Sequence, residues 1–183
     1  MWIFLAILVL VGFWLISAYN KLVSLRNKVQ EAWSGIDVQL KRRYDLIPNL
    51  VSTVKGYAAH ESDTLEKVIQ ARNQAISVQS GQVADKAQAE TVLTGALRQF
   101  FALSESYPDL KANTNFVELQ RSLTDIEDNI QNSRRYYNAL VRDNNTAVES
   151  FPANLIANNF GFVKFEFFEL ENSAERSNPQ VQF

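Results

Sequence analysis

The stretch LVSLRNKVQEAWSGIDVQLKRRYDLIPNLVSTVKGYA, residues 22–58, places an apolar residue at every third or fourth position. That spacing gathers the apolar side chains on one face of an α-helix. The rhythm crosses Pro48 without a shift in phase, so we expect the proline to kink a continuing helix rather than end it. The predicted stripe comprises Leu22, Leu25, Val29, Ala32, Ile36, Leu40, Tyr44, Ile47, Val51, Val54 and Ala58.

Two shorter helices are predicted after this stretch. The first covers about 62–80; Ser62 or Asp63 can cap its start, and Asp63 with Glu66 has the spacing of a capping box. The second covers about 83–105 and stops ahead of Pro108, because the residue before a proline is pushed out of the helical region. The side chains expected to point inward are Leu65, Ile69, Arg72 and Ile76 on the first, and Leu93, Leu97, Phe100 and Phe101 on the second.

A fourth helix, over about 114–150, has the most regular pattern in the chain. Its apolar steps alternate between three and four, which is typical of a coiled-coil-like seam. We expect Asn113 or Thr114 to cap its start and Pro152 to close its end. The predicted seam comprises Phe116, Leu119, Leu123, Ile126, Ile130, Ser133, Tyr137, Leu140, Asn144, Ala147 and Phe151.

The N-terminus reads as a membrane anchor. Residues 2–18, WIFLAILVLVGFWLISA, carry no charge, and residues 1–19 would form a helix of roughly 28 Å, close to the thickness of a bilayer core. A cleaved signal peptide is the alternative, but the basic segment that such peptides begin with is missing. Three cations follow the span, which favours a cytoplasmic body, with a periplasmic body left open; they are Lys21, Arg26 and Lys28.

The predicted fold is therefore all-α: an N-terminal transmembrane helix followed by a long antiparallel four-helix bundle with coiled-coil-like packing. Helices over 20–58 and 114–150 would be of similar length, roughly 58 and 55 Å, and the short pair laid end to end would match them. We expect an anchor at 1–19, a bundle at 20–159, a Phe-rich extended segment at 160–171 and a disordered tail at 172–183.

The Phe-rich segment leaves two hypotheses open. FGFVKFEFFEL, residues 160–170, is rich in residues that favour extended structure. It would either cover the open end of its own bundle or meet a neighbouring subunit or the membrane interface. The aromatic side chains expected to make those contacts are Phe160, Phe162, Phe165 and Phe167.

Composition excludes several kinds of site. Without cysteine, disulfides and thiolate metal sites are ruled out, and a single histidine, His60, cannot build a His-rich metal centre. A net charge of −2 argues against nucleic-acid binding. We interpret His60, beside Glu61 and Asp63, as a capping or surface residue, and we expect no catalytic residue, no metal and no cofactor.

The charged residues of the long helices are instead candidates for structural or intersubunit contacts. Lys41-Arg42-Arg43 would stand about 30 Å above the bilayer, too far for headgroups. Their expected partners are Asp45, Glu31 or acids of the fourth helix, and an i, i+4, i+8 spacing relates Asp37, Lys41 and Asp45. Arg134-Arg135 are expected to face Asp37 or Asp45. The candidate interaction residues are Asp37, Arg42, Arg43, Asp45, Pro48, Arg134, Arg135 and the four phenylalanines named above.

Two long segments resemble the hallmark sequences of the LemA family. They are YNKLVSLRNKVQEAWSGIDVQLKRRYDLIPNLVSTVKGYAAHESDTLEKVIQAR, residues 19–72, and RRYYNALVRDNNTAVESFPANLIANNFGF, residues 134–162. The resemblance implies a bacterial, single-span membrane protein with an antiparallel helical bundle. It implies no activity and no catalytic residues; a relative that looks to be involved in shaping magnetosome membranes points to membrane organisation rather than chemistry.

We therefore expect a membrane-anchored, non-enzymatic scaffold of the bacterial inner membrane. Its expected partners are the lipid bilayer, further copies of the chain and a membrane protein. The alternative is a membrane-tethered adaptor that regulates a partner such as an envelope protease or another membrane enzyme.

Overall fold

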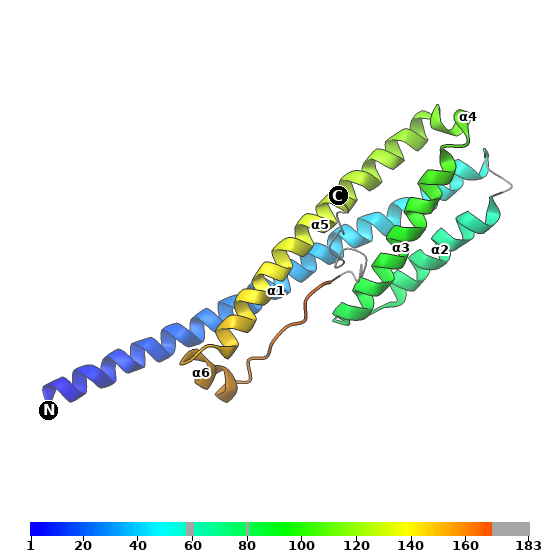
Figure 1. Ribbon diagram of the computed structural model, residues 1–183. Helices are drawn as coiled ribbons and strands as arrows, with labels where there is room; N and C mark the ends of the chain where they lie inside the picture. Colours follow the sequence, from blue (N-terminus) through cyan, green and yellow to red (C-terminus); the bar gives the residue numbers. More distant parts are fainter. Residues whose placement is uncertain (58–60, 80, 170–183) are drawn as a thin grey trace, which may run out of the picture. The chain divides into compact units, whose positions relative to one another are not determined.

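A computed structural model describes residues 1–57, 61–79 and 81–169. The described residues form helices and connecting segments, with no strand among them, so the predicted all-helical class is confirmed (Figure 1). His60 and the predicted disordered tail at 172–183 lie outside the described residues. The helices are α1 (Trp2–Lys55), α2 (Ser62–Ser77), α3 (Val83–Ser104), α4 (Pro108–Lys111), α5 (Thr114–Glu149) and α6 (Ala153–Asn159).

The chain divides into two compact units that share α1 and α5. Unit 1 comprises Met1–Gln39 and Asn129–Phe167, and unit 2 comprises Leu40–Asp128 with the described residues from Phe168 onward. Within unit 2, α2 packs against α3. Successive helices there run in opposite directions, from α1 through α2 and α3 to α5, as a helical bundle requires (Figure 1).

Helix α1 confirms the main prediction made from its apolar rhythm. Pro48 lies inside the helix, which runs on to Lys55. The predicted stripe is buried from Leu22 to Val54 except at Leu25, which is half-buried, while Ala58 lies outside the described residues. The first part of α1 is the segment of the described chain that is long and apolar enough to cross a membrane, and its side chains are exposed.

Helix α2 differs from its prediction in cap and in face. It begins at Ser62 with Glu61 at the N-cap, so Asp63 lies in the first turn and the predicted capping box of Asp63 and Glu66 is wrong. Ile76, expected to point inward, is exposed. The buried face lies one position earlier along the helix than predicted, and its members are Leu65, Val68, Ala71 and Ala75.

Helix α5 keeps the predicted start but not the predicted end of its seam. The Asn113 side chain accepts a hydrogen bond from the Phe116 N–H at 3.0 Å, which confirms the cap. Phe151 was expected in the seam, but the helix ends at Glu149 and Phe151 is 80% exposed. A strict seven-residue repeat drifts around a straight helix of 3.6 residues per turn, so Val148 takes the buried position near the end.

Candidate functional site

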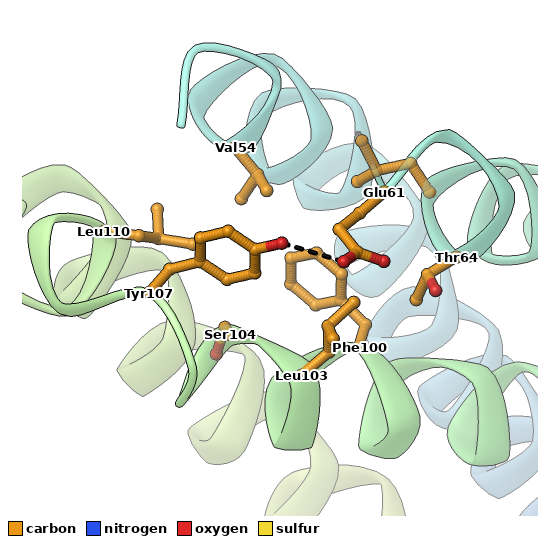
Figure 2. Close-up of a pocket in the computed structure, with 9 residues that line it drawn as sticks. Val54, Glu61, Thr64, Phe100, Leu103, Ser104, Tyr107 and Leu110 are labelled. Atoms are coloured by element: carbon orange, nitrogen blue, oxygen red, sulfur yellow. Dashed lines mark hydrogen bonds between the residues drawn. The ribbon is translucent and has the colours of Figure 1, made fainter. Parts of the chain in front are cut away.

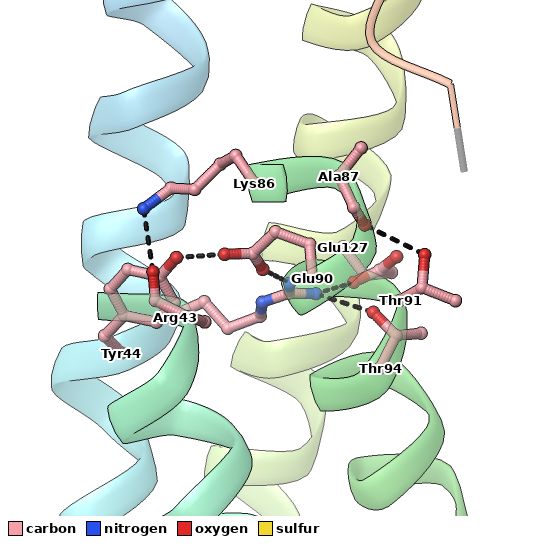
Figure 3. Close-up of polar contacts among 9 residues, drawn as sticks. Arg43, Tyr44, Lys86, Ala87, Glu90, Thr91, Thr94 and Glu127 are labelled. Atoms are coloured by element: carbon pink, nitrogen blue, oxygen red, sulfur yellow. Dashed lines mark hydrogen bonds and ion pairs between the residues drawn. The ribbon is translucent and has the colours of Figure 1, made fainter. Parts of the chain in front are cut away.

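A buried ion-pair network lies among the helices of unit 2 (Figure 3). Arg43 of α1 is 2% exposed, and its guanidinium donates to the carboxylates of Glu90 on α3 and Glu127 on α5. It also donates to the hydroxyl of Thr94 at 3.0 Å. The planar guanidinium suits this arrangement because its N–H groups form a fork that can serve several acceptors at once.

Helical spacing explains how charged side chains come to occupy core positions. Arg43 lies three residues after Leu40 and four before Ile47, both of which are buried. On α3, Glu90 lies three residues before Leu93, so it continues the same apolar face. The helix geometry therefore directs Arg43 and Glu90 into the bundle, and their opposite charges compensate each other there.

Lys86 and Tyr44 extend the network to the end of α2. The Lys86 ammonium donates to the carbonyl of Ala75 at 2.9 Å and to that of Val78 at 3.4 Å. It also lies 5.5 Å from the centre of the Tyr44 ring, whose hydroxyl donates to Glu90. The last carbonyl groups of a helix have no hydrogen-bond donor within that helix. Lys86 supplies one and so caps the C-terminal end of α2.

Sequence reasoning missed Glu90 and Lys86, although a signal for them exists. Steps of four and three lead from Lys86 and Glu90 to the apolar positions of α3. Neither residue was predicted to be buried, because ionised side chains are rarely fully buried unless they are paired. The apolar continuation of that stripe is Leu93, Leu97 and Phe100.

The predicted interaction residues near Arg43 on α1 differ in burial and in partner. Arg43 pairs with Glu127 on α5, an acid of the fourth predicted helix as expected. Arg42 and Pro48 are exposed. Asp45 is also exposed and pairs at 2.7 Å with Lys41 one turn earlier on the same helix, the spacing expected for a helix-face ion pair.

The predicted charges of unit 1 are less buried. Asp37 on α1 and Arg134 on α5 are both half-buried, and their pairing stays a prediction. Arg135 is exposed and donates to Asn132 at 3.0 Å on its own helix.

A second polar arrangement holds the segment after α6 against α5 in unit 1. The Asn145 side chain donates to the Phe165 carbonyl and accepts from the Phe165 N–H, both at 2.9 Å. The amide thus satisfies both backbone groups of Phe165, as a neighbouring strand would. Asn144 donates to the Val163 carbonyl at 3.3 Å and Tyr137 to the Glu166 carbonyl at 2.9 Å. Residues 163–166 therefore lie on the chain's own α5.

The four phenylalanines predicted to make contacts do not alternate regularly between buried and exposed positions. Phe162 is buried, Phe165 is half-buried, and Phe160 and Phe167 are exposed. Phe168, which the sequence analysis did not single out, is fully buried. The segment is extended but is not part of a sheet, so its side chains follow local contacts rather than a strict two-residue period.

The cavity drawn in Figure 2 lies in unit 2 beside Tyr107, whose hydroxyl donates to Glu61 at 2.8 Å. The hydrogen bond to the Glu61 carboxylate raises the pKa of Tyr107 above its usual 10.0, because it stabilises the protonated phenol. The volume is about 10 Å³, room for a single water. Apolar walls surround the pair, supplied mainly by Val54, Leu65, Phe100, Leu103 and Leu110.

Within the described part of the chain, no group of three or more acidic, histidine or cysteine side chains is placed to hold a metal ion. Two acids of unit 2, the buried Glu90 and the partly exposed Glu127, both bind Arg43. Chemically, this arrangement compensates the buried charges of Arg43 and Glu90.

Comparisons with known proteins place the chain in a family. Residues 32–183 match the LemA family. The chain is 28% identical over 153 residues to Protein LemA of Metamycoplasma hominis, which covers 82% of this chain and 68% of that relative. It is 24% identical over 193 residues to the magnetosome protein MamQ of Magnetospirillum gryphiswaldense, covering 91% and 71% respectively. For the magnetosome protein MamQ 2 of Paramagnetospirillum magneticum the identity is 24% over 179 residues, covering 85% and 66%.

The helical fold, the exposed apolar start of α1 and these relatives define a membrane-associated helical protein. The chain belongs to the LemA family, whose match covers most of its length.

Proposed function

We propose that this protein is a non-enzymatic scaffold of the bacterial inner membrane, anchored by a single span and assembled from several copies of the chain. The observation that carries the proposal is the continuity of α1. The apolar residues 2–18 and the packed residues from Leu22 onward belong to one uninterrupted helix. The similarity to proteins named for the magnetosome supports a role at a membrane.

Continuity of the helix favours a scaffold over a tethered adaptor. A flexible linker between anchor and body lets a bound domain search for partners, and such linkers are rich in Gly, Ser or Pro. Between Tyr19 and Leu22 the chain is helical instead, with Asn20 and Lys21 as the connecting residues. A helix joins the span to the start of the body at a fixed distance, which suits a protein that sets the geometry of an assembly.

The interior of unit 2 supports a structural role as well. Its most buried ionisable side chains, Arg43 and Glu90, bind each other rather than facing an open cleft. Replacing such pairs by apolar residues is often neutral or stabilising, so their use is better explained by specific packing than by raw stability. An assembly of identical copies requires that the helices of each copy pack in the same register, so that every copy presents the same surface.

The proposal is tested by counting copies in a bilayer. The full chain, carrying one fluorophore per copy, is reconstituted into vesicles at high lipid excess, and photobleaching steps are counted for each spot. We expect a fixed number of steps above one that persists on further dilution with lipid. Single steps throughout would overturn the scaffold and favour the adaptor, whose partner would then be a membrane enzyme such as an envelope protease.

The proposed orientation places the body in the cytoplasm, because Lys21, Arg26 and Lys28 follow the span closely. Paired reporters fused after Phe183 test this, one active only in the cytoplasm and the other only in the periplasm. Activity of the periplasmic reporter would reverse the orientation without affecting the copy number.

A further inference from the structure

Three exposed apolar side chains lie in the segment that runs from the end of α5 past α6, and α6 packs against the end of the anchor. Phe151 is 80% exposed, Leu155 is 56% exposed and Phe160 is 65% exposed. We call these three residues the apolar foot. Large exposed apolar side chains gathered in one short segment of a folded protein indicate contact with an apolar partner.

The foot is fixed to the anchor by packing within unit 1. Ile156 and Ala157 of α6 form a buried cluster with Leu22 of α1, and Ala18 packs against the same cluster. The rings of Tyr19 and Phe160 meet edge to face at 5.0 Å between centroids. The inner face of α6 therefore packs against α1 at the end of the apolar span, and Figure 1 shows the two helices side by side there.

That position coincides with the edge of a bilayer. Counted from Trp2 at 1.5 Å per residue, a hydrocarbon core of about 30 Å ends near residue 21, within one turn of Tyr19. Phe160, in contact with Tyr19, then lies at the boundary between acyl chains and headgroups. Side chains of this kind insert there to a depth of about 5–10 Å.

Charge along the chain agrees with this placement. Residues 150–163 contain no Asp, Glu, Lys or Arg. The charges on either side of that stretch, Glu149 and Lys164, pair with each other at 2.7 Å. An uncharged loop closed by an ion pair at its base can enter a membrane interface without burying an unpaired charge.

We propose that the apolar foot inserts into the bilayer interface beside the anchor, so that the protein holds the membrane at two points. The occupant of this surface is lipid, because Phe160 packs on Tyr19 at the end of the exposed apolar span. Two attachment points would restrict the tilt of α1 against the membrane, which a single span leaves free. The inference depends on the membrane span of the proposed function but not on self-association.

Single-cysteine labelling tests the proposal cleanly, because the chain has no cysteine of its own. The full chain with Leu155→Cys carries an environment-sensitive dye and is reconstituted into phosphatidylethanolamine–phosphatidylglycerol vesicles. Spin labels attached near the headgroup end or at the centre of the acyl chains then quench the dye according to its depth. Val38→Cys is the matched control, since Val38 is an exposed apolar residue of the same unit about 28 Å further along α1 than Tyr19.

We expect the shallow spin label to quench the dye at Leu155 at least about twofold more than the dye at Val38, and dilution with lipid to leave this unchanged. Equal quenching at the two sites would overturn the foot. If the emission of the dye at Leu155 rises with protein density and the spin-labelled lipids do not quench it, the insertion of the apolar foot is also refuted. The surface would then be a contact with a second copy of the chain. A Leu10→Cys probe reports on the span itself: if the deep spin label fails to quench it, the span and the foot both fail, whereas a quenched Leu10 confines any failure to the foot.

Discussion

Replacing Arg43 by methionine removes the charge at the centre of unit 2 while keeping an apolar side chain of similar length. The guanidinium lost in this variant donates to Glu90, Glu127 and Thr94. Glu90 is buried and keeps the Tyr44 hydroxyl as a donor, so most of its charge is left uncompensated. The Glu127 side chain is 27% exposed and can turn to water. We therefore expect a loss of about 3–5 kcal/mol, dominated by Glu90.

The loss is measured by urea unfolding of the full chain in detergent, followed by circular dichroism. At roughly 1–3 kcal/mol per molar urea, the unfolding midpoint should fall by more than about 1 M. Arg42→Met is the matched control, because Arg42 is exposed and should change stability by less than about 0.5 kcal/mol. The double variant Arg43→Met/Glu90→Leu should recover most of the loss, since apolar replacement of both partners leaves no buried charge in that pair. Equal losses for the two arginine variants, or a double variant as unstable as Arg43→Met alone, would refute the reasoning.

Three further predictions follow from other contacts. Asn145→Ala removes both hydrogen bonds to the Phe165 backbone, so amide exchange at Phe165 should accelerate about tenfold or more, and unchanged exchange would contradict this. Burial, aided by the nearby carboxylate, raises the pKa of Tyr137 to about 12 from 10.0. The folded state thus holds that proton more tightly than the unfolded state does; the resulting stability is complete below pH 10 and is lost as the pH rises through about 12. Tyr137→Phe should flatten the alkaline decline in the unfolding free energy, and an unchanged decline would assign it to other groups. Lys86→Met removes the cation that binds the Ala75 carbonyl and should lower the unfolding free energy in urea by about 1.5–3 kcal/mol; no loss would mean that water replaces the ammonium.

The sequence by itself determined the features that depend on local periodicity and backbone chemistry. The stripe of α1 identified a helix that crosses Pro48, because a proline removes one helical hydrogen bond but does not alter the phase of the side chains around it. The cap of α5 was narrowed to Asn113 or Thr114, because short polar side chains can reach the free N–H groups at a helix start, and Asn113 makes the bond. The uncharged run after Met1 likewise indicated a membrane span from length and composition alone.

Only the tertiary structure decided which faces were buried and which charges met. The steps of α3 place Lys86 and Glu90 on its inner face, but only the neighbouring helices supply Arg43, Tyr44 and the free carbonyls that make their burial tolerable. Ile76 was expected inside from its spacing, yet the packing of α2 in unit 2 buries the positions one residue earlier, Val68, Ala71 and Ala75. A buried ionised group is stable only when groups of opposite charge or hydrogen-bonding groups, often from distant parts of the chain, lie beside it. A helical pattern predicts which way a side chain points, but it does not predict which groups of other helices will contact it.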